Sequence, residues 1–169
     1  MTCRDLAVVG DGPAGLALAA ASRAVGLDVV LVGPGRPWPA TYGTWRDDVP
    51  MVPDDCFRVV LPGIAVHGHI RHQITRPYGI VDNDALRDHL GRGVETVAAT
   101  AERIRPMPWG STVVTPAGDV DARLVIDARG RRASPAGAAQ TAHGVVVPER
   151  PAGGPVLMDL RPAGPGPPT

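Results

Sequence analysis

Short apolar runs separated by glycine-rich turns mark the start of the chain. Residues 6–9 form a continuous apolar run that ends at glycines, which is typical of a strand buried on both faces of a parallel sheet. Residues 13–25 are rich in strong helix formers, begin with proline and stop at Gly26, so they predict a helix. Residues 28–32 predict a second buried strand, and residues 5–32 therefore predict one β-α-β unit.

The rest of the pattern predicts a proline-rich connection followed by short strands. Residues 33–53 contain five prolines and two tryptophans, which favours an ordered but irregular connection. A short helix is predicted at residues 83–90, with Asp82 or Asn83 as its cap. The predicted strands are residues 57–61, 64–74, 94–99, 104–115 and 119–126, of which the last two suggest a small β meander with a turn at residues 116–118.

The turn between the first strand and the first helix has the spacing of a phosphate-binding loop. Residues 10–15 read GDGPAG and match G-x-G-x-x-G in the required strand-turn-helix context. The first glycine permits the tight turn, the second lets a pyrophosphate approach the backbone, and the third lets helix and strand pack closely. The predicted cofactor-binding residues of this loop are Gly10, Gly12, Pro13, Ala14 and Gly15.

Two residues depart from the usual dinucleotide-binding pattern. Gly33 stands where an acidic residue at the end of the second strand would bind the adenosine ribose, and Asp28 lies at the wrong end of that strand. Asp11 places a carboxylate beside the phosphate loop, where it would repel phosphate unless it points into solvent or pairs with an arginine. We therefore expect ribose recognition to come from elsewhere or to be weak.

A second nucleotide-binding signal follows the predicted meander. The apolar residues 124–126 run into Asp127-Ala-Arg-Gly130, and strands ending in this way close over the nucleotide near the glycine loop in flavoproteins. Asp127 and Gly130 are therefore further candidate cofactor-binding residues. Flavin becomes a better candidate than nicotinamide.

Length, charge and cysteine content exclude several classes of protein. A chain of 169 residues allows about one domain. Its formal net charge of zero argues against a nucleic-acid partner. Cys3 and Cys56 are too few for a disulfide framework, which favours a reduced, cytoplasmic interior. The early glycines interrupt the first apolar run, so it predicts neither a signal peptide nor a membrane-spanning helix.

Five ordered blocks of sequence resemble the lycopene cyclase family of carotenoid biosynthesis. The Trp-Pro-x-x-Tyr-Gly-x-Trp pattern in the first block is far more specific than the glycine loop. The blocks are WPATYGTWRDD at residues 38–48, RPYGIVDN at 76–83, DARG at 127–130, QTAHG at 140–144 and LMDLR at 157–161.

The resemblance implies a Rossmann-like FAD/NAD(P)-binding α/β domain of three layers with an inserted β meander, as in glutathione-reductase-like flavoproteins. Residues 1–160 would form the FAD/NAD(P)-binding part. Residues 161–169 are rich in proline and glycine, and we expect this tail to be disordered.

The resemblance also implies a reaction. A carboxylic acid protonates a terminal double bond of lycopene, the carbocation closes onto a neighbouring double bond, and loss of a proton leaves an ionone ring. The reaction is an isomerisation that uses reduced FAD without net redox change, and NAD(P)H would serve only to reduce the flavin. Because the substrate is insoluble in water, the resemblance implies a cytoplasmic protein with peripheral contact at the inner face of a membrane.

Members of the family are about twice as long, and the chain is expected to be truncated. Their acidic catalytic motif follows the Met-Asp-Trp-Arg block, so we expect the catalytic acid beyond Thr169, in a missing C-terminal half or a complementary chain. Leu160, Arg129 and His143 replace the usual Trp, Thr and aromatic residue. The absence of the family's last strands should expose an apolar edge on the sheet.

Several side chains have two readings. Trp38, Tyr42 and Trp45 could face the polyene or the flavin, or could anchor the long loop to the sheet. Asp47 and Asp48 match an acidic pair of the family and could raise one another's pKa, although a solvated loop end is the stronger interpretation.

Histidines and arginines supply weaker candidates. His67, His69 and His72 alternate so that the first two could share a strand face, but exposed polar residues are a better interpretation than a metal site, and we expect no metal. Three arginines could contact phosphate or an anionic lipid surface, namely Arg129, Arg131 and Arg132. Arg87, on the short helix, could approach the flavin phosphates.

Two other functions remain open on the sequence. The same cofactor-binding half occurs in flavin-dependent oxidoreductases, such as hydroxylases or prenyl reductases, which would consume NAD(P)H in proportion to product. Alternatively, the 169-residue chain could be a non-catalytic, truncated dinucleotide-binding fragment.

Overall fold

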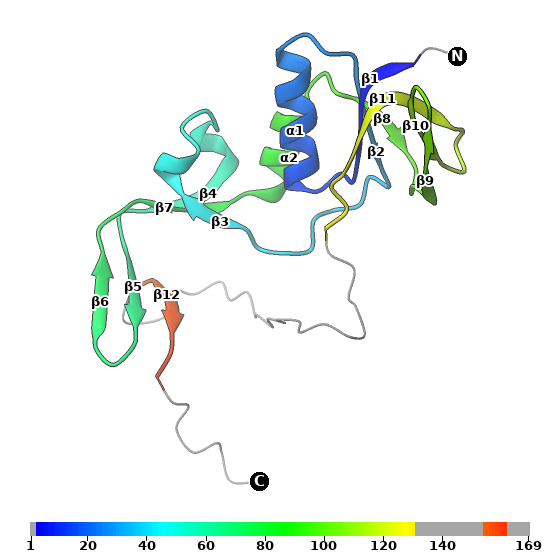
Figure 1. Cartoon of the computed structure of the whole chain (residues 1–169). Helices are drawn as coiled ribbons and strands as arrows, with labels where there is room; N and C mark the ends of the chain where they lie inside the picture. The colour runs from blue at the N-terminus through cyan, green and yellow to red at the C-terminus, as the bar shows by residue number, and fades with distance from the viewer. Residues whose placement is uncertain (1–2, 131–153, 162–169) are drawn as a thin grey trace. The chain divides into compact units, whose positions relative to one another are not determined.

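The computed structural model describes residues 3–130 and 154–161, which fall into two compact units (Figure 1). Unit 1 comprises residues 1–40 and 83–138, and unit 2 comprises residues 41–82 and 139–169. The candidate nucleotide-binding loop belongs to unit 1. Residues 162–169 of the predicted disordered tail lie outside the described residues.

A six-stranded mixed sheet forms the centre of unit 1, in the order β8-β2-β1-β11-β10-β9. Four neighbouring strands are parallel: β8 (Glu95–Ala98), β2 (Val29–Gly33), β1 (Arg4–Val9) and β11 (Val120–Asp127). The other two continue antiparallel from β11: β10 (Gly110–Val114) and β9 (Arg103–Met107). Among the described residues of this unit, the helices are α1 (Pro13–Ala24) and α2 (Asn83–Gly91).

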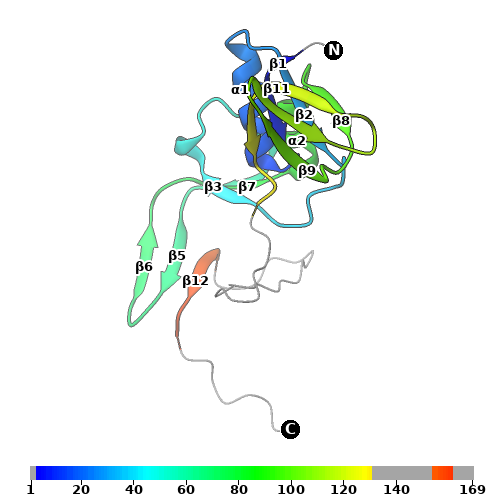
Figure 2. The ribbon, with the colours of Figure 1, turned by 45° about the vertical axis from the view of Figure 1, so that its right-hand side comes forward.

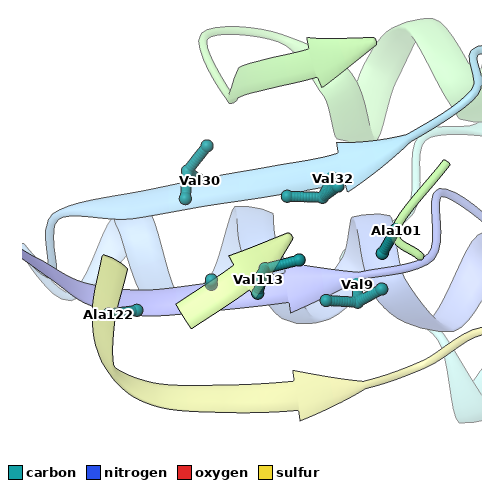
Figure 3. Packing of buried hydrophobic residues seen from close by; sticks show 7 residues of the cluster. Val9, Val30, Val32, Ala101, Val113 and Ala122 are labelled. Carbon is teal, nitrogen blue, oxygen red and sulfur yellow. The ribbon is translucent and has the colours of Figure 1, made fainter. Parts of the chain in front are cut away.

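Unit 1 has three layers, which are the helices, the parallel strands and the meander of β9, β10 and β11. Successive residues of the central strands point to opposite faces, so both faces of the sheet are covered. Leu6 and Val8 of β1 pack on the helical side, in a cluster that includes Leu16 of α1. On the other face, Val9 packs in a cluster with Val113 of the meander (Figure 3). Figure 2 turns the meander toward the viewer, with α1 behind it. The three-layer α/β fold predicted from the sequence is therefore confirmed.

Strand β11 belongs both to the meander, as its last strand, and to the parallel sheet. Its predicted turn at residues 116–118 is confirmed, because the Thr115 hydroxyl accepts a hydrogen bond from the amide of Ala117 (3.1 Å) and donates one to the carbonyl of Gly118 (2.7 Å). The pairing of β11 with β10 ends at Ala122. Beyond this point, Leu124 is 56% exposed. The apolar edge expected from the sequence stays a prediction.

The described residues of unit 2 form two three-stranded sheets and two short 3-10 helices. One sheet has the order β3-β7-β4, with β3 at Gly43–Trp45, β7 at Tyr78–Val81 and β4 at Phe57–Leu61. The other has the order β12-β5-β6, with β12 at Val156–Asp159, β5 at Ile64–His67 and β6 at Arg71–Ile74. The 3-10 helices are Arg46–Asp48 and Asp54–Cys56.

Three predictions for unit 2 were wrong or incomplete. The connection predicted to be irregular contains β3, and β7 was not predicted. The strand predicted over residues 64–74 is a hairpin, because the amide of Gly68 donates to the carbonyl of Ile70 (3.0 Å) and the chain reverses there. The strands β3 and β7 are defined by pairing with each other at a distance in sequence, and the hairpin by its turn, and hydrophobic periodicity reveals neither.

Candidate dinucleotide-binding site

The glycine loop begins where β1 ends between two other strands. Gly10 has a φ of +114°, which favours glycine, and its amide donates to the carbonyl of Val32 on β2 (2.8 Å). A Cβ atom on Gly10 would lie 2.7 Å from the carbonyl carbon of Ala128, just after β11. The first glycine is therefore required both by its backbone conformation and by the close approach of the next strand.

The other two glycines of the loop differ in their surroundings. A Cβ atom on Gly15 would lie 1.8 Å from the carbonyl oxygen of Gly10, so helix and turn can pack this closely only with glycine there. A Cβ atom on Gly12 would meet nothing within 4 Å. The second glycine therefore faces space that a pyrophosphate can enter.

The first turn of α1 suits an anion. Gly12 is the N-cap and has no side chain to offer, Pro13 follows at the first helical position, and the first turn contains no acidic residue. The amides of Ala14 and Gly15 at this end are among those that an α-helix leaves without an intrahelical partner. Such a terminus binds phosphate through these amides and the helix dipole, so the loop fits the diphosphate of a dinucleotide.

Asp127 and Gly130 lie at the same end of the sheet as the glycine loop. Asp127 is opposite Val9 in the pairing of β11 with β1, and the amide of Ala128 donates to the carbonyl of Val9 (2.7 Å). The Arg129 guanidinium binds both Asp127 carboxylate oxygens, with Nε–Oδ1 at 2.8 Å and Nη2–Oδ2 at 2.6 Å, and these bonds raise the pKa of Arg129. Arg129 therefore holds the Asp127 carboxylate.

Asp11 forms an ion pair within unit 1. Arg87 Nη2 lies 3.3 Å from Asp11 Oδ2, and the amide of Gly35 donates to the same oxygen (2.7 Å). Arg87 also donates to the carbonyl of Arg36, and its guanidinium lies 5.9 Å from the centre of the Trp38 ring. The structure thus places Arg87 against Asp11, the arginine partner that the sequence left open.

Trp38 is held within unit 1. Its Nε1 atom donates to the carbonyl of Asp11 (2.8 Å), and its ring packs against the cluster on the helical face of the sheet. Asn83 was considered only as a helix cap, yet its Nδ2 atom donates to the carbonyls of Trp38 (3.1 Å) and Ala40 (2.8 Å). Within the described part of the chain its buried Oδ1 atom has no recorded partner. These contacts favour the anchoring interpretation of Trp38.

Tyr42 and Trp45 belong to unit 2, so they are not assigned to one cluster with Trp38. The carbonyl of Tyr42 accepts a hydrogen bond from the amide of Val81 (2.9 Å). Trp45 stands edge-on to Tyr78, with ring centres 5.1 Å apart, and the Arg76 guanidinium lies 5.0 Å from the centre of the Trp45 ring. These two side chains stay predicted candidates for facing substrate or flavin.

The acidic pair of unit 2 lies against one arginine. Arg76 Nε lies 2.8 Å from a carboxylate oxygen of Asp47, and Arg76 also forms an ion pair with Asp48. The hydrogen bond from Arg76 lowers the pKa of Asp47 below its ordinary value. The suggestion that the two carboxylates raise each other's pKa toward that of a general acid is therefore wrong for Asp47, because a guanidinium lies against it.

The histidines do not alternate along one strand face. His67 ends β5, His69 lies in the hairpin turn and His72 lies on β6. In the portions that the structure describes, no group of three His, Cys, Asp or Glu side chains could hold a metal ion.

Several candidates from the sequence lie outside the described residues. They are Arg131, Arg132, His143 and the block at residues 140–144.

The last block, residues 157–161, lies partly on β12. Asp159 accepts hydrogen bonds from Arg161 Nε (2.8 Å) and from the amide of Arg161 (3.1 Å), and these hold the pKa of Asp159 well below its usual range.

Among the described residues no helix is long and apolar enough to cross a membrane.

The fold is the Rossmann-like α/β fold of flavoproteins, with a glycine loop directly after β1. A solved structure titled as the flavin-dependent brominase Bmp2 is similar, with a TM-score of 0.61 over 77% of this chain and 39% of that one, at 20% sequence identity. This likeness concerns the fold alone.

The sequence relatives define the family. The family described as "Lycopene cyclase protein" matches residues 5–168, so the chain belongs to the lycopene cyclase family. A Deinococcus radiodurans protein named "Uncharacterized carotenoid cyclase" is 39% identical over 93% of this chain and 42% of its own length. A lycopene beta cyclase of Synechococcus elongatus is 33% identical over 84% of this chain and 39% of its own length. The chain thus spans about two fifths of these relatives.

Proposed function

We propose that the chain is the FAD-binding part of a lycopene cyclase that converts the end groups of lycopene into ionone rings. One observation carries this proposal. In this member of the lycopene cyclase family, the space beside Gly12 in the glycine loop is open, and the first turn of α1 presents amides there that no side chain caps. A diphosphate fits this loop. The flavoprotein fold supports FAD as the dinucleotide, and NAD(P)H is proposed only as its reductant.

The proposed reaction balances without a net oxidant. A carboxylic acid gives a proton to the terminal double bond, a carbon–carbon bond closes the ring, and another proton leaves. When bound, reduced FAD supplies an electron-rich ring that stabilises positive charge nearby. The glycine loop and the first turn of α1 would hold its diphosphate and so fix its position.

We assign no catalytic acid to the described residues. Arginines lower the pKa of Asp47 and of Asp159, which favours the charged carboxylate in each, and Asp127 is bound to Arg129. The proposal therefore places the acid in a carboxyl-terminal half or a complementary chain. Tyr42 and Trp45 are proposed to face the polyene or the flavin. Because lycopene dissolves in lipid, we propose a cytoplasmic location with peripheral contact at the inner face of the membrane.

A chimera tests the proposed function. Residues 1–161 of this chain would replace the matching amino-terminal part of the Synechococcus elongatus lycopene beta cyclase, and the chimera would be expressed in a bacterial host that accumulates lycopene. We expect cyclic carotenes by chromatography, with the intact Synechococcus protein as positive control.

The same experiment separates a cyclase from an oxidoreductase. Ring formation by the purified chimera should consume NAD(P)H far below one equivalent per ring, since the nucleotide only reduces the flavin. Stoichiometric consumption would favour a flavin-dependent hydroxylase or reductase. A folded, flavin-loaded chimera that forms no ring would contradict the proposed function.

A further inference from the structure

The Asp11 side chain occupies the space beside Gly33, next to the glycine loop. In Rossmann-like sites an acidic residue ends the second strand, and its carboxylate accepts hydrogen bonds from ribose hydroxyls. Gly33 ends β2 here and has no side chain. A Cβ atom on Gly33 would lie 2.4 Å from Cβ and 2.5 Å from Cγ of Asp11. The Asp11 carboxylate therefore fills the space into which a side chain of residue 33 would project.

We infer that Asp11 supplies the ribose-binding carboxylate that residue 33 lacks, and that it accepts hydrogen bonds from the adenosine hydroxyls of the dinucleotide. This inference rests on the proposed binding of FAD by the glycine loop. It turns the two apparent departures of the sequence into one exchange, in which the carboxylate has moved from the end of β2 to the loop after β1.

The hydrogen bonds of Asp11 leave one oxygen for a ligand. Oδ2 accepts from the amide of Gly35 and from Arg87. In the described part of the chain no donor is recorded for Oδ1. The Asp11 side chain is 15% exposed and lines a pocket of about 320 Å³ together with Arg87 and Asp88, so a ligand can reach it.

Arg87 reduces the repulsion that the Asp11 carboxylate would exert on the phosphates. Its guanidinium lies against Asp11 and compensates the negative charge near the glycine loop. The bond from Gly35 also fixes the carboxylate relative to the loop that follows β2. Asp11 is thus oriented before any ligand arrives, as a recognition residue should be.

The test compares ligands that differ only in the ribose hydroxyls. Dissociation constants of ADP and 2′,3′-dideoxy-ADP would be measured by calorimetry for the 169-residue chain, for Asp11→Gly and for the double variant Asp11→Gly/Gly33→Asp. Gly33 has no positive φ, so an aspartate fits its backbone once Asp11 is removed. Far-UV circular dichroism would establish that each variant is folded.

The natural chain should bind ADP about tenfold or more tightly than dideoxy-ADP, because hydrogen bonds to a charged group are lost with the hydroxyls. The ratio should fall to about one in Asp11→Gly and recover in the double variant. A general loosening of the loop would weaken both ligands equally and leave the ratio unchanged.

The inference is overturned if the natural chain does not distinguish the two ligands, if Asp11→Gly keeps the ratio, or if the natural chain binds neither ligand. A parallel titration with FAD separates this outcome from the proposed function. If the ratio for ADP depends on Asp11 while FAD does not bind, the ribose assignment stands and the FAD proposal fails. If FAD binds and the ratio is independent of Asp11, the reverse holds.

Discussion

Gly15 and Gly10 are in such close contact that a Cβ atom on Gly15 would lie 1.8 Å from the Gly10 carbonyl oxygen. The obstacle is backbone and cannot rotate away. Gly15→Ala must therefore move α1 away from the turn, and we expect it to lower the free energy of unfolding by about 1–3 kcal/mol. Urea denaturation followed by circular dichroism measures this loss.

Gly26→Ala is not a suitable comparison for this substitution, because Gly26 has a φ of +89°. Gly91→Ala in α2 is better matched, since its nearest neighbour is a Leu16 methyl group at an ordinary 3.8 Å. It should change stability by less than about 1 kcal/mol. Equal stability of Gly15→Ala and the natural chain would show that helix and turn do not pack as described.

Gly12→Ala should separate binding from folding. Its Cβ would meet no protein atom within 4 Å and its φ of −72° suits alanine, so the unfolding free energy should change by less than about 1 kcal/mol. The added methyl group would stand in the space proposed for the pyrophosphate, and FAD affinity should fall about tenfold or more. Fluorescence titration of FAD measures the change, and unchanged affinity would place the phosphates elsewhere.

Trp38→Phe tests whether this indole anchors its loop. The substitution keeps an aromatic ring but removes the Nε1 donor to the Asp11 carbonyl, so we expect a loss of about 1 kcal/mol in stability. Trp109, which is 45% exposed in the turn between β9 and β10, supplies the control variant Trp109→Phe, with an expected change of less than about 0.5 kcal/mol. Equal urea midpoints for the two variants would contradict the anchoring role.

The ion pair of Asp47 with Arg76 predicts a pH dependence of stability. Its pKa is lower in the folded chain than the ordinary 3.8 because Arg76 donates a hydrogen bond to it. Such a group stabilises the fold above its unfolded pKa, and the contribution is lost as the pH falls through the folded pKa. Arg76→Gln should therefore lower the urea midpoint at pH 6, and the difference from the natural chain should shrink below about pH 4.

Part of the effect of Arg76→Gln should persist in acid, because the contact of the guanidinium with the Trp45 ring does not involve a proton. Arg105→Gln is a useful control, since Arg105 lies 3.7 Å from Asp119 and both side chains are well exposed. Its midpoint should stay close to that of the natural chain at every pH. A pH-independent deficit in Arg76→Gln would mean that the pKa of Asp47 is not lowered by this arginine.

The sequence was informative where structure depends on neighbours along the chain. The β-α-β unit and the loop at residues 10–15 follow from buried strands, helix formers and glycine spacing, and all lie within about thirty residues. The strands β3 and β7 were missed because Gly43–Trp45 is short, lies in a proline-rich segment, and becomes a strand only by pairing with Tyr78–Val81.

The relation between Asp11 and Gly33 could not be derived from either residue alone. Each was recognised as a departure, yet they are separated by two secondary-structure elements, and only the packed sheet brings them together. The pairing of Asp47 with Arg76 is similar, because it depends on how distant parts of unit 2 fold. Charges were visible in the sequence, but their partners were set by tertiary structure.

Equilibrium dialysis of FAD against the folded chain shows whether the glycine loop holds a flavin dinucleotide. We expect saturable uptake of about one FAD per chain, displaced by ADP and weakened in Gly12→Ala. Cooperative unfolding of the same sample would show that it is folded. Absence of FAD uptake by folded protein, both in the 169-residue chain and in the chimera, would contradict the claim that the loop after β1 holds a flavin dinucleotide.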